Sequence, residues 1–373
     1  MRANKYRLRK AGASLWILLL LVLFLLVGCG KGQSAEEYLQ ERMEAFQAGD
    51  DELANALLDL EIQEADGDYV LQFPEELRED YLSFLKKACS NIKYKIVDSK
   101  SFQDGSKITL ELWPVDVESA VSSQDAVYLQ QLASTDLTTA VKEILEQDTA
   151  LLGQAKQGRK QKLVLRVEET DSGYQIEDAS MQELAENILE GPMKPYKDVA
   201  ELLDIRDYLE AFLNASYKGD VARYAEHTGQ EQSVALEKYE ESFSAEGLSD
   251  LALNDEQQSR FTNAMKTIFA NSSYEIGQIR SGAQGGYVLD VTLKSNLSLQ
   301  KSRQEFENKA SGGRYSTSAQ LAEAYISILE KYAANPVYGE QTSMELQLDE
   351  GALSVSGSSD EKLDAFLEMI LPS

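Results

Sequence analysis

Residues 94–113, YKIVDSKSFQDGSKITLELW, decide the fold, because two strand-like segments meet there at the dipeptide Asp104-Gly105. From Ile108 to Leu112, apolar residues alternate with polar ones, which is the period of a strand with one buried face. An Asp-Gly pair is favoured in tight hairpin turns. The stretch therefore predicts an antiparallel hairpin, and its apolar face requires helices to cover it.

The same pattern returns in residues 274–293, YEIGQIRSGAQGGYVLDVTL, at an offset near 180 residues. Order and spacing also persist in a later pair of strand-like segments. The matching positions are Tyr94 and Tyr274, Ile96 and Ile276, Ile108 and Leu289, Leu110 and Val291, Leu112 and Leu293, Leu163 and Met344, Leu165 and Leu346, and Val167 and Leu348. This self-similarity predicts one fold written twice, with about ten additional residues in the second copy.

Helices are expected around the strands of both copies. Stretches that begin at Tyr38 and Tyr208 reach Gly49-Asp50 and Gly219-Asp220, where glycine is typical of a helix end. Amphipathic helices are predicted between the strand pairs, around Leu132 to Leu152 and Ala319 to Ala334, and a final helix follows the last strand. Further turn signals are Asp171-Ser172-Gly173, Gly285-Gly286 and Glu350-Gly351. Each copy thus reads helix, helix, two strands, helix, two strands, helix.

The break between the copies is predicted at Gly191-Pro192-Met193-Lys194-Pro195, which holds two of the six prolines. Each copy is long enough for a core of its own. The predicted organisation is a signal peptide at residues 1–28, a tether at 29–34, a first α+β repeat at 35–190, a linker at 191–197 and a second α+β repeat at 198–373.

The first residues have the features of an export signal. Five Lys and Arg residues and no acidic residue occur in the first ten positions, and all thirteen residues from Leu15 to Val27 are apolar. Such a run forms only about 20 Å of helix, shorter than the roughly 30 Å hydrocarbon core of a bilayer. We therefore expect a secretory signal peptide. An uncleaved signal anchor is the alternative, and it would also tether the chain outside the membrane.

The apolar run ends on Leu26, Val27, Gly28 and Cys29. These residues resemble the lipobox of bacterial lipoproteins, which has Leu at −3, a small residue at −1 and Cys at +1. The resemblance implies that the Cys29 sulfur receives a diacylglyceryl group, that residues 1–28 are removed, and that fatty acids such as palmitate hold the protein on the extracytoplasmic face of the cell membrane. It also favours a Gram-positive host. Two acyl chains give stable anchoring.

The balance of charged residues limits the kinds of molecule that the protein can bind. The chain has 36 Lys and Arg against 63 Asp and Glu, a net charge of −27. Removal of residues 1–28 takes away five of the positive charges and no acidic residue, so the remainder carries −32. This balance argues against nucleic acid as partner, since phosphate binding needs clustered positive charge. It predicts solubility and repulsion from anionic surfaces, with a cationic partner as the alternative.

The predicted order of elements resembles the NTF2-like or cystatin-like modules that occur in tandem in secreted bacterial lipoproteins. The resemblance implies helices packed on a curved antiparallel sheet, with a concavity that can hold a ligand. The final helix departs from the usual NTF2-like ending. Binding and catalysis both occur on such a scaffold, so the resemblance alone does not choose between them.

Two residues invite a catalytic interpretation. Cys89 matches Phe269 on the apolar face of a helix, which favours a buried structural thiol over a nucleophile. His227 is the single histidine, and it matches Leu57 in the helix after the Gly-Asp pair. One histidine excludes metal sites with two or more His. We expect a structural or exposed side chain, with a catalytic role as the alternative.

Other motifs are weaker. The acidic segment Asp59 to Asp68 lacks the residue order of a calcium-binding EF-hand, so Asp66-Gly67-Asp68 is expected to be a solvated turn. Gly312-Gly313-Arg314 lacks the spacing of a phosphate-binding loop. Trp113 is the only Trp after residue 28 and offers little for sugar stacking. The sequence therefore assigns no catalytic, cofactor-binding or metal-ligating residue.

The sequence thus favours a non-enzymatic lipoprotein that contacts the bilayer through acylated Cys29 and binds an envelope protein, a peptide or a small solute. The alternative is a secreted hydrolase with carboxylates in the concavity of one sheet. That alternative predicts polar, convergent side chains in one copy where the other copy is apolar. A solute receptor of the ABC type would need two α/β lobes, which the hairpin pattern contradicts.

Overall fold

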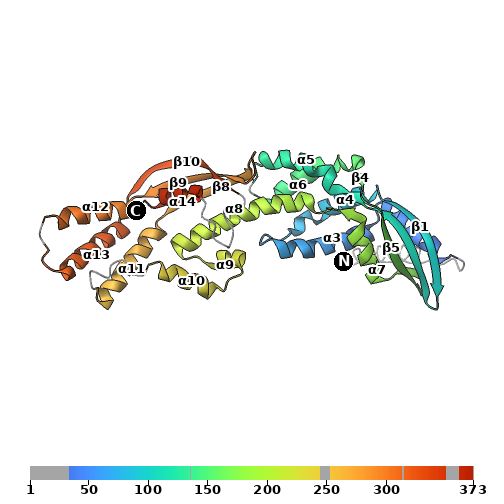
Figure 1. The fold of residues 1–373 in the computed structure, drawn as a ribbon, viewed down its shortest axis with the longest axis horizontal. Coiled ribbons are helices and arrows are strands. Elements are labelled where there is room, and N and C mark those ends of the chain that lie inside the picture. The colour runs from blue at the N-terminus through green and yellow to red at the C-terminus, as the bar shows by residue number, and fades with distance from the viewer. Residues whose placement is uncertain (1–32, 135, 244–252, 313–314, 350–360, 373) are drawn as a thin grey trace, which may run out of the picture. The chain divides into compact units, whose positions relative to one another are not determined.

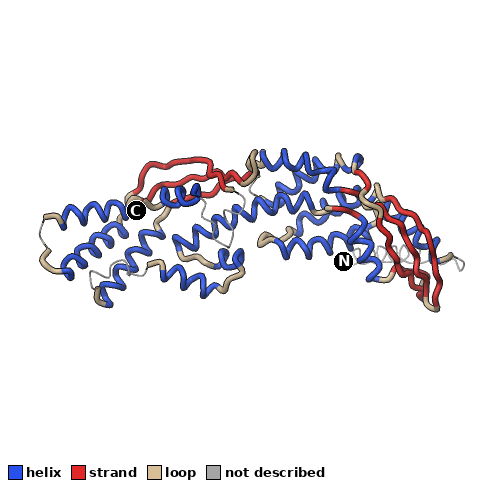
Figure 2. Tube along the Cα trace, viewed as in Figure 1, coloured by secondary structure: helices blue, strands red, loops and turns tan. Residues whose placement is uncertain are grey.

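The computed structural model describes residues 33–134, 136–243, 253–312, 315–349 and 361–372, and the fold is mixed α and β (Figures 1 and 2). The chain divides into two compact units. Unit 1 holds the residues up to Gln63 together with 78–121 and 145–194, and unit 2 holds 64–77, 122–144 and the residues from Pro195 onward. One unit boundary thus falls within the predicted linker, but residues 64–77 and 122–144 group with unit 2 and not with the first repeat.

Unit 1 is built around a four-stranded antiparallel sheet. Its main elements are α2 (Ala35–Gln47), α4 (Arg78–Cys89), β1 (Lys93–Phe102), β2 (Gly105–Trp113), β5 (Gln161–Thr170), β6 (Gly173–Ile176) and α7 (Asp178–Ile188). The strand order is β1-β2-β5-β6. Helix α2 contacts all four strands, α4 packs on α2, and α7 contacts β5. Ser34 and Glu37 form a capping box that fixes the start of α2.

A small second sheet lies in the same unit. It joins β3 (Val115–Asp116), β4 (Lys156–Gln157) and β7 (Leu189–Glu190), with β3 and β7 parallel. A 3-10 turn, η2 (Leu152–Gln154), precedes β4. Helices α3 (Asp51–Asp68), α5 (Val117–Gln130) and α6 (Leu137–Thr149) have residues in both units, and η1 (Glu75–Leu77) lies in unit 2.

Unit 2 repeats the combination of a sheet with covering helices. Its elements are α8 (Lys194–Lys218), α9 (Ala222–Thr228), α10 (Gln232–Glu241), α11 (Asp255–Ala270), β8 (Ser273–Ser281), β9 (Tyr287–Asn296), α12 (Ser298–Ala310), α13 (Ser318–Ala334), β10 (Tyr338–Leu348) and α14 (Glu361–Ile370). The antiparallel sheet has the order β10-β9-β8. Helix α13 packs on α11 and α12, and α14 contacts β9 and β10.

The two sheets pair corresponding residues. In unit 1, Tyr94 lies opposite Leu112, Ile96 opposite Leu110, Leu110 opposite Leu163 and Ile108 opposite Leu165. In unit 2, Tyr274 lies opposite Leu293, Ile276 opposite Val291, Val291 opposite Met344 and Leu289 opposite Leu346. The register shifts directly after Ile96 and directly after Ile276. The strand register of β1-β2-β5 therefore corresponds to that of β8-β9-β10.

Glycines sit where the backbone must turn. Gly49 follows α2 with φ +90° and Gly219 follows α8 with φ +71°, the left-handed geometry predicted for these helix ends. In the first hairpin Phe102 pairs with Gly105, so the loop is Gln103-Asp104. Gly285 and Gly286 also have positive φ at the corresponding turn. Glu350-Gly351 lies outside the described residues.

Several predicted segments differ from the structure. The linker at 191–197 is helical from Lys194 onward, because Pro195 occupies the first turn of α8, where its missing N–H costs nothing. Asp66-Gly67-Asp68 is the last turn of α3 and not a separate turn. The helix expected around Leu132 to Leu152 is α6, and α5 is an additional helix before it.

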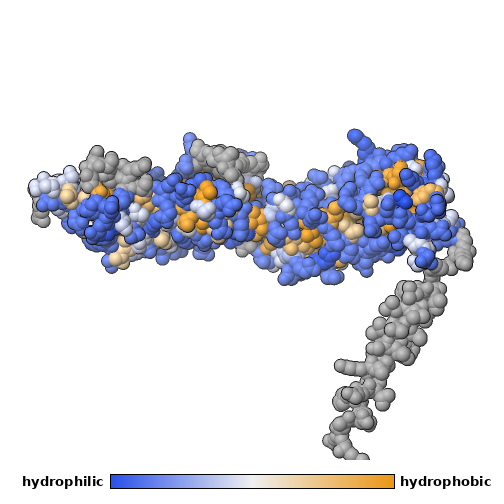
Figure 3. All heavy atoms as spheres, turned by 90° about the horizontal axis from the view of Figure 1, so that it is seen from below, coloured by the Kyte–Doolittle hydropathy of each residue, from blue (hydrophilic) through white to orange (hydrophobic). Residues whose placement is uncertain are grey.

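Most of the surface seen in Figure 3 is hydrophilic, in keeping with the 27% of charged residues. Hydrophobic residues show there only in small separate areas. Within the described ranges, no helix combines the length and apolar character that crossing a membrane requires.

Candidate functional sites

The inner face of the first sheet is filled with apolar side chains. Ile108, Leu110 and Leu112 on the central strand have 0% exposure. Their neighbours on β5 and the helices above them are buried as well: Leu163, Leu165, Val167, Leu39, Met43, Phe46, Tyr81 and Leu85. The concavity in which the hydrolase alternative would place its carboxylates is therefore occupied by a hydrophobic core.

The second sheet is packed in the same way. Leu289, Val291 and Leu293 on β9 are at most 2% exposed, and Leu346 and Leu348 on β10 are buried beside them. Apolar side chains thus fill the inner faces of both sheets. The hydrolase alternative predicts one polar and one apolar interior, whereas both inner faces are apolar.

Cys89 is the structural thiol that its position predicts. It lies at the end of α4 with 2% exposure, and burial raises the pKa of its thiol to about 12. The thiolate is the reactive form of cysteine, so a raised pKa keeps this group inert at neutral pH.

His227 belongs to a cluster of charged side chains on α8 and α9. Its side chain is 4% exposed, its Nε2 lies 2.8 Å from Asp207 Oδ2, and its Nδ1 lies 3.6 Å from Asp204 Oδ2. Arg223 Nε donates to the same Asp207 oxygen at 2.6 Å. The ring of Tyr208 meets the imidazole edge to face at 5.3 Å. His227 is therefore buried and paired with two aspartates.

These contacts set the protonation state of the cluster. Burial lowers the pKa of His227, but hydrogen bonds to Asp204 and Asp207 outweigh burial and raise that pKa to about 9. Burial raises the pKa of Asp207, yet hydrogen bonds from His227 and Arg223 hold it below its ordinary value. The imidazole thus carries a proton at neutral pH. A general base must be free of its proton to act, so the cluster is suited to holding structure.

Asp204 extends the cluster to a distant part of the sequence. Its Oδ1 accepts hydrogen bonds from the backbone N–H groups of Val70 and Leu71, both at 3.1 Å. The Tyr196 hydroxyl donates to the Leu71 carbonyl at 3.1 Å. His227 therefore helps to hold the segment after α3 against α8 within unit 2. The spacing of Asp204 and Asp207, three residues apart on one helix, is the sequence signal for this arrangement.

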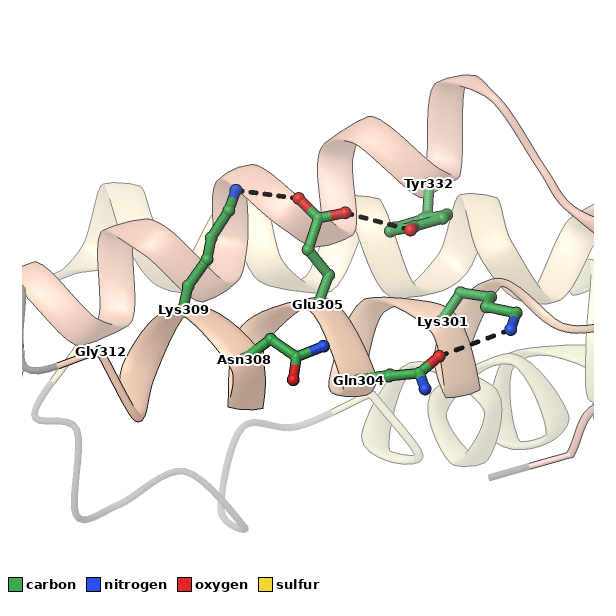
Figure 4. A pocket seen from close by; sticks show the side chains of 7 residues that line it. All are labelled: Lys301, Gln304, Glu305, Asn308, Lys309, Gly312 and Tyr332. Carbon is green, nitrogen blue, oxygen red and sulfur yellow. Dashed lines mark hydrogen bonds and ion pairs between the residues drawn. The ribbon is translucent and has the colours of Figure 1, made fainter.

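A polar cleft of about 430 Å³ lies between α12 and α13 (Figure 4). Glu305 is at its centre: Lys309 donates to one carboxylate oxygen at 2.8 Å, and Lys331 and Tyr332 donate to the other at 2.6 and 3.1 Å. Hydrogen bonds from Lys309 and Lys331 lower the pKa of Glu305 to about 2. This carboxylate therefore remains ionised and neutralised by its neighbours, which does not suit a general acid.

A second cleft, of about 640 Å³, opens at one end of β1 and β2. Its lining includes Gln47, Lys93, Tyr94, Lys95, Trp113 and Gln157. The Lys160 ammonium lies 5.9 Å from the centroid of the Trp113 ring and 2.9 Å from Glu111 Oε1. Trp113, which the sequence makes a weak candidate for stacking, is half-buried and lies near lysine side chains.

The remaining predicted residues have ordinary roles or lie outside the described ranges. Asp66 accepts a hydrogen bond from the Phe73 backbone N–H at 2.8 Å, and Asp68 lies 3.8 Å from Lys197 Nζ. Gly312 lines the Glu305 cleft. The lipobox residues Leu26, Val27, Gly28 and Cys29, together with Gly313 and Arg314, lie outside the described residues.

No protein-family model and no curated protein matches this chain. Among solved structures, the chain is similar to the lipoprotein candidate YcdA of Bacillus subtilis, with 13% identity and a TM-score of 0.34. The similarity covers 76% of this chain and 97% of that one.

Proposed function

We propose that this protein is a lipoprotein held by acylated Cys29 on the extracytoplasmic face of the cell membrane, where it binds an envelope protein, a peptide or a small solute without catalysis. The lipobox motif directly after an apolar run supports the anchor. The observation that favours binding over hydrolysis is the apolar filling of both inner sheet faces, which leaves the outer surfaces for recognition.

Fatty-acid labelling tests the anchor. Cells that express the full chain are grown with a radiolabelled or alkyne fatty acid, and the protein is then immunoprecipitated. We expect label in the wild-type protein and none in a Cys29→Ala variant, whereas a Cys89→Ala variant keeps its label. Equal labelling of the Cys29→Ala variant would rule out the assignment.

We also infer that the chain is a tandem duplication of one α+β module of the NTF2-like or cystatin-like kind. The inference is supported by the matching register of β1-β2-β5 and β8-β9-β10. Expression of residues 35–190 alone tests the proposed boundary, with Trp113 as the fluorescent probe. A single cooperative unfolding transition is expected, and a product without one would refute it.

A further inference from the structure

We propose that the outer face of the first sheet contacts the anionic phospholipid headgroups of the membrane to which the protein is tethered. The proposal rests on the lipid anchor proposed above and adds a second, protein-mediated contact with the same bilayer. We call this surface the basic face and define it by six outward side chains: Lys93, Lys95, Lys100, Lys107, Lys162 and Arg166.

Strand register places these side chains together. Two rows cross the sheet from β1 through β2 to β5, and a third joins β1 and β2 only. The rows are Lys93 opposite Trp113, Lys95 opposite Glu111 opposite Lys162, and Lys100 opposite Lys107 opposite Arg166. Successive residues of a strand point to opposite faces, and the intervening Ile108, Leu110 and Leu112 are buried on the inner face. All three rows therefore lie on the outer face.

The positive charge of this face runs against the composition of the chain. Its six basic residues stand with only three acidic ones, Asp98, Glu111 and Glu168. The corresponding face of the second sheet has Arg280 and Lys294 with Glu275, Asp290 and Glu345, an acidic balance. In a chain of net charge −27, the basic face is therefore a local reversal of sign.

Part of this charge is not taken up in ion pairs, although Lys95 and Lys162 flank Glu111 and act on it electrostatically. Among the described residues, Lys93, Lys95, Lys107 and Lys162 form no ion pair within 4 Å. Lys107 lies between Lys100 and Arg166, and like charges so placed destabilise a sheet. Asp98 pairs with Lys100 at 3.3 Å and Glu168 with Arg166 at 3.2 Å, so part of this repulsion remains at Lys107. An anionic surface brought against the face would offset this repulsion.

The apolar groups on the same face favour a membrane over a purely polar polymer. Val164, in the outward position between Lys162 and Arg166, is 49% exposed. Trp113 is half-buried at the end of the face with Lys160 over its ring. Tryptophan and lysine side chains with apolar bodies and polar ends are typical of the membrane–water interface.

The tether is long enough for this contact. Five residues lie between Cys29 and Ala35 at the start of α2, and these six residue steps reach about 20 Å when extended. The ring of Tyr38 in the first turns of α2 lies 6.2 Å from that of Tyr174 on β6, so α2 begins at an edge of the sheet. A helix and a sheet pack about 10 Å apart, which the tether can span.

The test uses the processed, lipidated protein in vesicles whose acyl chains carry bromine near the headgroup. Trp113 is the only Trp after residue 28, so quenching of its fluorescence reports contact of this face with lipid. We expect quenching in vesicles that contain phosphatidylglycerol and little in vesicles of phosphatidylcholine alone. Reversing Lys93, Lys95 and Lys162 to Glu should lower the docking equilibrium about 100-fold or more, because each basic residue contributes roughly 1 kcal/mol at an anionic surface.

A matched control reverses three exposed basic residues elsewhere, Lys87→Glu, Lys294→Glu and Arg303→Glu, and should keep the wild-type quenching. Circular dichroism of both triple variants checks that they fold. If the protein floats with both kinds of vesicle but its Trp113 fluorescence is quenched equally in each, the proposed contact with anionic headgroups is wrong and the lipid anchor stands. Failure to float with phosphatidylcholine would instead overturn the anchor. A third outcome would overturn the choice of a bilayer. In it, the wild-type protein binds an anionic wall polymer, the variant with Lys93, Lys95 and Lys162 reversed does not, and neither protein shows lipid-dependent quenching.

Discussion

Raising the pH from about 5.5 to about 9 should remove about 3 kcal/mol of stability from the wild-type protein, and a His227→Gln variant should lack most of this loss. The reason is the position of His227 between Asp204 and Asp207. In the variant the side chain keeps its polarity and approximate size, but it has no proton to lose over this range.

The magnitude follows from two pKa values. Hydrogen bonds to the two aspartates raise the pKa of His227 against burial to about 9, compared with about 6.5 for histidine in an unfolded chain. The difference corresponds to about 3 kcal/mol. Because the folded-state pKa is the higher one, the stabilisation is fully present below about pH 6.5 and is lost as the pH rises through about 9.

Urea denaturation followed by far-ultraviolet circular dichroism at a series of pH values measures this effect. The series stays below about pH 10, where tyrosines of the unfolded chain begin to ionise. Glu226→Gln, which removes an exposed charge from the same helix, is the matched control and should keep the wild-type slope. Parallel curves for wild type and His227→Gln would refute the assignment of a protonated, ion-paired imidazole.

Three further predictions concern the packing of the units. Gly219→Ala should lower the free energy of unfolding by about 3 kcal/mol, because φ is positive there and the added Cβ would lie 2.6 Å from the Tyr239 ring. Gly229 also has a positive φ but has open space around it, so Gly229→Ala should lower the free energy of unfolding by only about 1 kcal/mol. Equal losses in urea denaturation would contradict the steric argument. Leu110→Ala should lower the free energy of unfolding by about 3 kcal/mol, measured in the same way, since Leu110 has 0% exposure; a loss below about 1 kcal/mol would show that the strand is not central to the core. Cys89 should react with a disulfide reagent at least about 100-fold more slowly in the native protein than in urea, because burial raises its thiol pKa to about 12, and rapid native labelling would count against its burial.

The strands could be predicted from the sequence because a strand with one buried face has apolar residues at every second position. The alternation at Ile108, Leu110 and Leu112 predicted three buried positions, and all three have 0% exposure. The duplicated pattern also aligned Tyr94 with Tyr274, and these residues lie at corresponding places in the two sheets. The buried position of Cys89 was predicted from the same comparison and is confirmed.

Helix α12 could not be predicted from a pattern of apolar residues. Its buried residues include only Ser298 and Ser302, so it has no apolar stripe of the kind that marks a helix against a core. The pairing of His227 was missed for a different reason. Its partners come from the preceding helix, and Asp204 is itself bound to the backbone of Val70 and Leu71, more than 130 residues earlier. The spacing of Asp204 and Asp207 indicates that both lie on one face of a helix, but the groups that they bind depend on tertiary packing.

The basic face could not be predicted from the net charge, which sums over the whole chain. A net charge of −27 predicts repulsion from anionic surfaces, and the six basic residues of the face are spread over three strands, one of which, β5, lies far from the other two in the sequence. In a linear reading they appear as the ordinary exposed half of amphipathic strands. Only the register, which sets Lys95 and Lys162 on either side of Glu111 and Lys100 beside Lys107, shows that they gather on one surface.

The irregular edges of the two sheets bear on aggregation. The edge strands β1, β8 and β10 each contain a shift in register, and the remaining edge, β6, is only four residues long. Bulges and short strands interrupt the row of free backbone groups that a neighbouring chain could extend by strand addition. Lipid-anchored molecules share a two-dimensional surface, where encounters between copies are frequent. Blunted edges would let such a protein reach high density on a membrane without forming intermolecular sheets.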